Sequence, residues 1–174
     1  MANINILEEL LDNETNQLII EELQKNGLWT LAFDHNLEND SCDQGFNMLT
    51  HCLAPNVRTY PNEVLNGIGH IIFRKVINAL NEDSNECLAV RFLYNYYNRS
   101  SSGQPHFDNP DPDSKSIVYY FNTCDGGTVV DDKYIESKSG RAVVFDSNIL
   151  HYGVGPKIDK NRYVLNILYL KGKK

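Results

Sequence analysis

A histidine and an aspartate stand two residues apart in the segment His106-Phe107-Asp108. In an extended strand, side chains at positions i and i+2 point to the same face, so this imidazole and this carboxylate can hold one edge of a metal ion. A second imidazole, that of His151, follows a strand-like run at 141–146 and lies 43 residues after Asp108. In a β-rich body, a strand two or three connections later can lie beside the first. These three side chains are therefore the predicted metal ligands.

Two histidines and one carboxylate on one face leave three octahedral positions open, which is the arrangement of non-haem Fe(II) oxygenases. A 2-oxo acid can chelate iron through its keto oxygen and C1 carboxylate, and O2 can take the last position. The far carboxylate of such an acid needs a cation at a fixed distance. Arg162 follows His151 by 11 residues, across a turn-forming stretch and on a strand-like run. Because a guanidinium pairs with a carboxylate through charge-assisted hydrogen bonds, Arg162 is the predicted anchor.

Each of these residues also has an ordinary structural interpretation when it is taken alone. A single His-x-Asp occurs often by chance, a lone His151 is typical of a hydrogen-bonded strand end, and a lone Arg162 is typical of a surface arginine. The combination of residue types, spacing and strand context favours the metal site. A structural zinc site would need an irregular set, because the sequence has no Cys-x-x-Cys motif. Its members would be Cys42, His51, Cys52 and Cys87. A Cys–His nucleophile pair stays open but has no supporting motif.

Two helices are predicted in the first half of the chain, over 12–26 and 61–80. Asp12 or Asn13 can cap the first helix, and Pro61 suits the first turn of the second. Both segments carry apolar residues at helical spacing, so each is expected to bury one face against a sheet.

The second half of the chain is predicted to be β-rich. The whole chain, 1–174, is expected to be a single domain, with 1–86 as a helical support region and 87–170 as the β core. The segment 4–11 is compatible with a strand, a short helix or a loose arm, and 36–45 is a polar loop. The strand-like runs, separated by turn clusters, are 29–33, 88–97, 116–122, 127–130, 141–146 and 161–170.

Composition narrows the choice of partner and compartment. The chain has 174 residues and a formal net charge of −7, and this acidic balance disfavours a nucleic-acid partner. The basic cluster at 171–174 is typical of a solvated chain end. No apolar run suits a membrane span, and the start does not have the pattern of a secretory signal. With four cysteines and no Cys-x-x-Cys, we expect reduced thiols and a cytoplasmic protein.

The sequence resembles the 2-oxoglutarate and Fe(II)-dependent oxygenases. The resemblance covers about residues 88–170, and within the superfamily it is greatest to prolyl 4-hydroxylases of the oxygen-sensing kind. It implies a fold that is mainly β with N-terminal helices, namely a double-stranded β-helix, also called a jelly roll or cupin-like fold. The residues that carry it are His106-Phe107-Asp108-Asn109-Pro110, Val118-Tyr119-Tyr120-Phe121-Asn122, Asp125-Gly126-Gly127, Gly140-Arg141-Ala142-Val143-Val144-Phe145, His151 and Arg162.

Carried over by position, the resemblance assigns cofactors and cosubstrates. His106, Asp108 and His151 would bind Fe(II), and Arg162 would bind the C5 carboxylate of 2-oxoglutarate. O2 would be the second cosubstrate, and the resemblance is compatible with ascorbate as an auxiliary reductant.

Further pocket residues follow from the same resemblance. Tyr120 matches a tyrosine that hydrogen-bonds the C5 carboxylate, and Tyr96 matches another pocket tyrosine. Tyr94 is the alternative to Tyr96, because the two share one face of a strand. All three are also plausible core aromatics. Asn166 falls on the same strand face as Arg162 and is expected either near the iron or in a structural hydrogen bond.

The implied activity is hydroxylation of a C–H bond, most simply that of a prolyl residue in a protein or peptide, gripped by loops such as 36–45 and 99–104. Collagen-type prolyl hydroxylases usually carry lysine where this chain has Arg162, which favours the oxygen-sensor or general oxygenase branch. A nucleic-acid oxidative dealkylase shares the motif, but the acidic charge counts against it. A small-molecule or free amino-acid hydroxylase stays open. A catalytically silent jelly-roll binding module is the non-enzyme alternative, and the presence of all three ligands with Arg162 counts against it.

Overall fold

The structure is a computed structural model that describes residues 3–26, 30–31, 48–53, 63–99, 101–159 and 161–172. These residues form two helices and ten strands. The helices are α1 (Asn13–Asn26) and α2 (Glu63–Ala79). The strands are β1 (Asn5–Leu7), β2 (Thr30–Leu31), β3 (Met48–Leu53), β4 (Cys87–Asn98), β5 (Ser114–Tyr120), β6 (Gly127–Val130), β7 (Lys133–Glu136), β8 (Ala142–Asp146), β9 (His151–Val154) and β10 (Asn161–Lys171).

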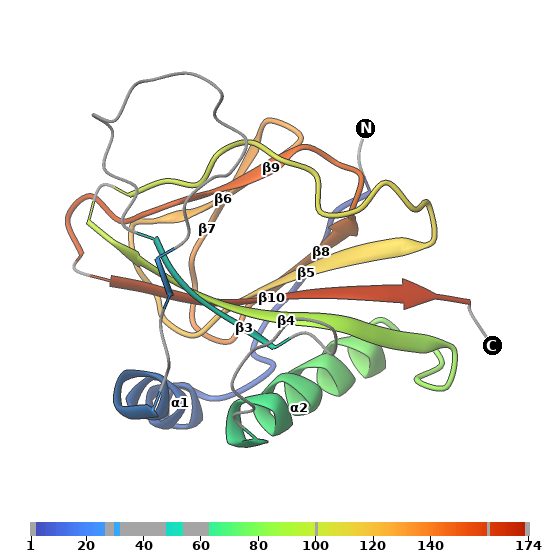
Figure 1. Ribbon diagram of the computed structural model, residues 1–174, viewed down its shortest axis with the longest axis horizontal. Coiled ribbons are helices and arrows are strands. Elements are labelled where there is room, and N and C mark those ends of the chain that lie inside the picture. The colour runs from blue at the N-terminus through green and yellow to red at the C-terminus, as the bar shows by residue number, and fades with distance from the viewer. Residues whose placement is uncertain are drawn as a thin grey trace.

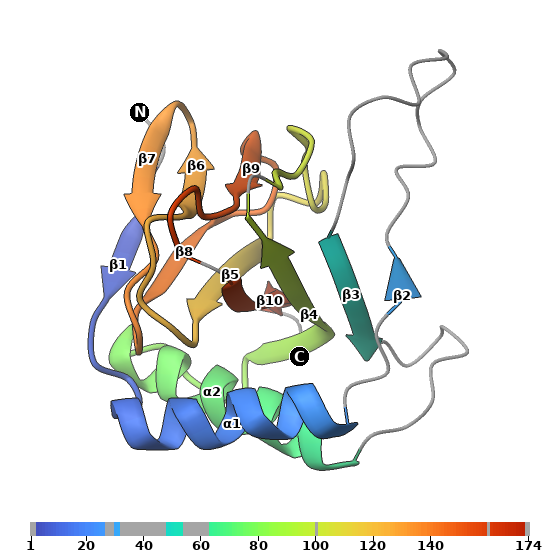
Figure 2. The same cartoon turned by 90° about the vertical axis from the view of Figure 1, so that its left-hand side faces the viewer.

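Two antiparallel sheets face each other. The major sheet has seven strands in the order β1-β8-β5-β10-β4-β3-β2, and the minor sheet has three in the order β7-β6-β9. Figure 1 shows the minor sheet above the major sheet, with both helices beneath the latter. Figure 2 shows the same layers from the side, with α1 and α2 lying across the outer face of the major sheet. This arrangement is the predicted jelly roll braced by N-terminal helices, and the prediction of the fold class is confirmed.

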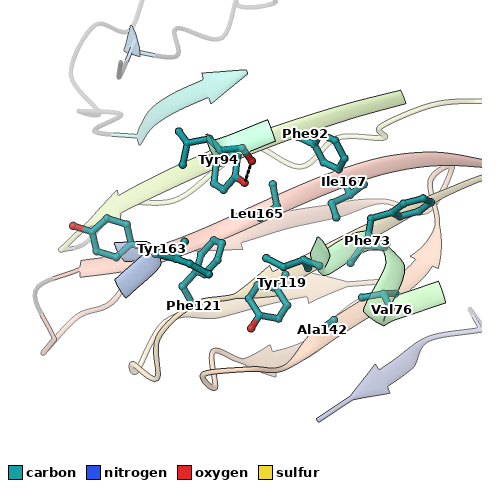
Figure 3. Packing of buried hydrophobic residues seen from close by; sticks show 14 of the residues in the cluster. Phe73, Val76, Phe92, Tyr94, Tyr119, Phe121, Ala142, Tyr163, Leu165 and Ile167 are labelled. Carbon is teal, nitrogen blue, oxygen red and sulfur yellow. Dashed lines mark hydrogen bonds between the residues drawn. The ribbon is translucent and has the colours of Figure 1, made fainter. Parts of the chain in front are cut away.

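The helix-facing side of the major sheet carries the larger apolar cluster. Alternate residues of its central strands point toward the helices, as period-two geometry requires. Figure 3 shows these side chains with those of α2 between the sheet and the helix. Tyr94 donates a hydrogen bond to the Leu65 carbonyl oxygen at 2.6 Å, so the phenol satisfies its polar atom inside the cluster. The buried members include Leu23, Leu65, Ile72, Val76, Phe92, Tyr94, Ile117, Tyr119, Val144, Leu165, Ile167 and Tyr169.

Local chemistry explains where the two helices lie. Asp12 caps α1, because its carboxylate accepts a hydrogen bond from the Thr15 amide at 2.7 Å. In α2, a Cβ on Gly69 would lie 2.9 Å from the Phe92 ring, so glycine lets the helix approach β4 closely. Both helices begin and end within about three residues of their predicted bounds.

The opposite, inner faces of the two sheets enclose a second and smaller cluster. Its buried members are Tyr97, Val118, Tyr120, Val130, Ile135, Val143, Phe145 and Val164. Because these residues alternate with the helix-facing ones, the central strands of the major sheet are buried on both faces. Polar side chains interrupt this inner cluster at one end, and the predicted metal ligands lie there.

The segment 4–11, for which a strand, a short helix and a loose arm were all open, contains the edge strand β1, which pairs with β8. Other elements differ from the sequence prediction. Strands β3, β7 and β9 were absent from the predicted set. Of the predicted strand at 29–33, only Thr30–Leu31 lies within the described residues, and the loop at 36–45 lies outside them. Among the helices that the structure describes, none has the length and hydropathy to cross a bilayer.

Candidate metal centre and cosubstrate pocket

Two segments that are far apart in sequence bring three side chains together. His106, Asp108 and His151 each offer one ligand atom, and these atoms all lie within 4.8 Å of one another. The Nε2 atom of His106 is 3.8 Å from Asp108 Oδ1, and that of His151 is 3.4 Å from Asp108 Oδ2. The structure therefore brings together the three predicted ligands.

Backbone pairing fixes the two histidines opposite each other. His106 and His151 exchange two N–H···O hydrogen bonds, each of 3.0 Å, in an isolated bridge outside the main ladders. Asp108 is held in the same way, because its amide donates to the Ser147 carbonyl oxygen at 2.9 Å. The loop that carries the His-x-Asp motif is thus fastened to the β8–β9 connection.

Both imidazoles are oriented by backbone carbonyls. The Nδ1 atom of His106 lies 2.8 Å from the Gln104 oxygen, and that of His151 lies 2.9 Å from the Ile149 oxygen. A carbonyl oxygen only accepts, so each Nδ1 donates to its carbonyl and each Nε2 is turned toward Asp108. The His151 side chain is 2% exposed, and its Nε2 has no hydrogen-bond partner.

Asp108 is buried and held in its charged form. Burial by itself raises the pKa of Asp108, but the neighbouring His151, the charge of Arg91 and a hydrogen bond from Ser116 together outweigh burial and hold the pKa well below its usual value. The donor set is therefore two imidazole nitrogens and one carboxylate. This set fits a divalent cation, because such a cation would satisfy the orphaned Nε2 of His151 and neutralise the carboxylate.

Arg162 is the largest fully buried side chain of the interior, with 1% exposure. Its Nη2 donates to Thr128 Oγ1 at 2.8 Å, whereas its Nε and Nη1 have no partner. The guanidinium carbon lies 4.6 Å from the Tyr97 ring centre and 5.3 Å from that of Tyr120. Burying a cation without a counter-charge is costly, so this pocket fits an anionic group such as a carboxylate.

Glycine on β9 lets the backbone approach Arg162 and Tyr97 closely. A Cβ added at Gly153 would lie 2.3 Å from the Tyr97 hydroxyl and 3.0 Å from Arg162 Nη1. The Tyr120 hydroxyl is also buried and without a hydrogen-bond partner. Burial raises the pKa of Tyr120, although the Arg162 charge partly offsets this, so the phenol keeps its proton and can donate to an anion.

The structure does not bring Tyr96 or Tyr94 into this pocket. Tyr96 lies on the helix-facing side of β4 and donates to Asn161 Oδ1 at 2.8 Å, and Tyr94 is bonded to the Leu65 carbonyl on the same side. Tyr97 is the β4 tyrosine that faces Arg162, its register partner on β10. A shift of one residue along a strand moves a side chain to the other face, which is why the predicted position missed the pocket.

The register of the sheet places two asparagines between the anchor and the metal residues. On the inner face, Arg162 and Tyr97 form one pair and Leu168 and Arg91 form another, six residues further along β10. Asn95 and Asn166 lie between these pairs, and both have a buried Oδ1 atom without a hydrogen-bond partner. The predicted inward orientation of Asn166 agrees with this placement.

Sequence reasoning did not identify five polar residues of this interior, namely Tyr97, Thr128, Asn95, Arg91 and Ser116. One signal was present for three of them, because Arg91, Asn95 and Tyr97 follow one another at even spacing along β4. Thr128 and Ser116 belong to strands whose pairing the sequence does not reveal.

Comparison with known proteins identifies the fold. No protein-family profile and no curated protein matches the chain by sequence. Among solved structures, the alpha ketoglutarate dependent epimerase SnoN from nogalamycin biosynthesis has a TM-score of 0.72 at 8% identity, over 98% of this chain and 79% of that one. A prolyl hydroxylase from Trichoplax adhaerens, in complex with a hypoxia inducible factor peptide fragment, has a TM-score of 0.67 at 14% identity, over 98% and 84%. HygX from Streptomyces hygroscopicus, with nickel and 2-oxoglutarate bound, has a TM-score of 0.67 at 10% identity, over 98% and 83%.

The fold and the site define a jelly-roll protein with a His-Asp-His cluster that could hold a metal ion. More particularly, the chain has the fold of the 2-oxoglutarate-dependent oxygenases, which is the fold that the sequence resemblance implied.

Proposed function

We propose that this chain is an Fe(II)- and 2-oxoglutarate-dependent dioxygenase that hydroxylates a C–H bond. The observation that carries the proposal is the convergence of His106, Asp108 and His151 in one interior that also holds the buried, under-bonded Arg162. A metal site and an anion site that lie along the same inner sheet face suit the two ends of a 2-oxo dicarboxylate. The similarity to structures described as alpha ketoglutarate dependent, or as holding 2-oxoglutarate, supports the same assignment.

The proposed roles follow from what each side chain can donate. His106, Asp108 and His151 hold Fe(II). Arg162 binds the C5 carboxylate through its free Nε and Nη1 atoms, and the Tyr120 hydroxyl donates to the same group. The iron, when bound with 2-oxoglutarate and O2, supplies the oxidising chemistry that yields succinate, CO2 and a hydroxylated product.

The protein's own contribution is orientation and exclusion of water. Thr128 holds one arm of the Arg162 guanidinium at 2.8 Å, so its remaining donors have a fixed direction. The ring of Tyr97 shields the guanidinium from solvent, and Gly153 lets that ring approach. Asn95 and Asn166 offer unpartnered amide oxygens to a ligand or an ordered water along the pocket floor.

The proposed substrate is a prolyl residue in a protein or peptide. The sequence resemblance and the structural similarity to a peptide-bound prolyl hydroxylase both support this choice. Phe107, between two of the ligand residues, is 60% exposed, and Leu150 beside His151 is also exposed, so the rim of the site offers apolar contact to a pyrrolidine ring. The net charge of −7 favours a neutral or basic target.

The test is a substrate screen with the full chain loaded with Fe(II) and 2-oxoglutarate. Proline-containing peptides are expected to stimulate succinate release more than methylated oligonucleotides do, and mass spectrometry should place one added oxygen on proline. Asp108→Ala serves as the inactive control. Stimulation by oligonucleotides instead would support a dealkylase. If the protein binds metal but turns over no 2-oxoglutarate with any of the compounds screened, it would be a non-catalytic binding module.

A small-molecule hydroxylase is the second candidate. The highest TM-score among the three comparisons above belongs to an epimerase from nogalamycin biosynthesis, which supports a small-molecule substrate as much as a peptide. The same screen separates the two candidates when it includes free amino acids and other small molecules. A hydroxylated small molecule with no peptide product would favour this alternative.

A further inference from the structure

Asp108, a predicted metal ligand, forms an ion pair with Arg91. Of the ion pairs of Asp108 within the described residues, this one is the shortest. The Nη2 atom of Arg91 lies 2.7 Å from Asp108 Oδ1, and the Asp108 side chain is only 5% exposed. Arg91 comes from the middle of β4, whereas Asp108 comes from the loop before β5. The pair therefore joins the loop that carries two of the three metal-binding residues to the rigid major sheet.

Ser116 holds the other oxygen of the same carboxylate. Its hydroxyl donates to Asp108 Oδ2 at 2.5 Å. Arg91 and Ser116 lie on the two strands that flank β10, and both have Leu168 as their register partner. The carboxylate is thus held from both sides across one strand, with a separate donor on each oxygen.

This arrangement leaves lone pairs for a metal while it removes rotational freedom. A carboxylate has about four lone-pair sites, and one donor on each oxygen occupies two of them. The remaining sites stay available on the side where His106 and His151 approach Asp108 within 3.8 and 3.4 Å. Asp108 is therefore held in one orientation by a separate donor on each oxygen.

We propose that Arg91 and Ser116 are positioning residues that preorganise Asp108 for metal binding. This inference rests on the metal site of the proposed function. Two effects of Arg91 oppose each other: its positive charge repels a divalent cation, and its hydrogen bond holds the ligand in place. Partners of metal ligands usually raise affinity about 10–100-fold, so the positioning effect is expected to dominate.

The experiment titrates the metal-free full chain with Mn(II) by calorimetry, and with Co(II) by visible absorption. Arg91→Met should weaken Mn(II) binding about tenfold or more, Arg91→Lys should recover most of that loss, and Ser116→Ala should weaken binding to a smaller extent. The Co(II) bands of Arg91→Met at saturation should differ from those of the wild type, because the carboxylate then has a different geometry.

Lys115→Met is the matched control. Lys115 makes an ion pair of the same 2.7 Å length with Asp146, on β5 and β8 and outside the metal-binding cluster. Its loss should leave Mn(II) affinity unchanged. If Arg91→Met does not fold, as judged by near-ultraviolet circular dichroism, Arg91→Lys and Ser116→Ala carry the test.

The outcomes separate this inference from the proposed function. Wild-type Mn(II) affinity in both Arg91→Met and Ser116→Ala, or tighter binding in Arg91→Met, would overturn the positioning role while the metal site stands. Absence of Mn(II) and Co(II) binding in the wild type would overturn the metal site itself, and this inference with it.

Discussion

The guanidinium of Arg162 lies against the face of Tyr97, with 4.6 Å between the guanidinium carbon and the ring centre. The two residues are register partners on β10 and β4, so the backbone ladder itself sets this stacking. Tyr120 covers the guanidinium at 5.3 Å, and Thr128 holds one of its arms. Arg162 is therefore a preformed buried cation with two unpartnered donors, Nε and Nη1.

Arg162→Met is expected to weaken 2-oxoglutarate binding about 10–100-fold, because a hydrogen bond to a charged group contributes about 1.5–3 kcal/mol. Arg162→Lys should keep part of the affinity, since it keeps the charge but loses the planar fork. Calorimetric titration of the Mn(II)-loaded protein with 2-oxoglutarate measures both. Mn(II) affinity itself should not change, and equal 2-oxoglutarate affinity in wild type and Arg162→Met would place the anchor elsewhere.

Tyr97→Leu and Tyr96→Leu form a matched pair on neighbouring positions of β4. The first removes the ring that stacks on Arg162, and it should weaken 2-oxoglutarate binding several-fold, since a cation–π contact contributes about 0.5–2 kcal/mol. The second removes a ring on the helix-facing side and should lower the melting temperature without a change in 2-oxoglutarate affinity. The reverse pattern would restore Tyr96 as the pocket tyrosine.

Metal binding is expected to stabilise the fold. At a free Mn(II) concentration 100 times the dissociation constant, the free energy of unfolding should rise by about 2.7 kcal/mol. For a chain of this size, that corresponds to an increase of about 5–10 °C in melting temperature. Differential scanning fluorimetry with and without a chelator measures the change. His151→Ala should abolish the metal-induced increase, and a full increase in that variant would remove His151 from the ligand set.

Cys87 is expected to react slowly with alkylating reagents at pH 8. Burial and the adjacent Glu82 raise the pKa of the Cys87 thiol to about 11, so the thiolate fraction there is about a hundredfold lower than at its usual pKa near 9. Only the thiolate reacts with the reagent. The labelling rate of Cys87 should therefore increase as the pH rises toward 11. Site-resolved mass spectrometry after iodoacetamide treatment measures the rate.

Two controls test whether the raised pKa is the cause of slow Cys87 labelling. In guanidinium chloride, Cys87 should be labelled at an ordinary rate at pH 8. Glu82→Gln removes the charge that accepts a hydrogen bond from Cys87 Sγ at 3.5 Å, so the folded variant should be labelled faster. Rapid labelling of folded wild type at pH 8 would contradict the raised pKa.

The sequence predicted the metal-binding cluster better than the pocket around it. Residue type and spacing were sufficient for His106, Asp108 and His151, because few side chains can serve as ligands and the His-x-Asp spacing suits a strand. Residue type and spacing were not sufficient to choose among the tyrosines of β4. The major sheet is buried on both faces, so aromatic residues occur on either side, and alternation does not reveal which face meets the metal. That choice depends on the partner strand, and only the pairing of Tyr97 with Arg162 resolves it.

The helices were predicted closely because each has one apolar stripe and recognisable end signals, such as Asp12 before α1. The four-residue strands β7 and β9 were not predicted, whereas β6, of the same length, was, because only β6 ends in a run of β-branched residues. Their existence depends on pairing with β6, which is a tertiary effect.

The reciprocal backbone bridge between His106 and His151 closes a loop of more than forty residues that contains β5, β6, β7 and β8. Such a long-range contact forms late, because the entropy of loop closure must be offset by strands already in place. A chain emerging from the ribosome would thus bring His106, Asp108 and His151 together only when the two sheets are nearly complete, and metal binding at the proposed site would report on completed folding.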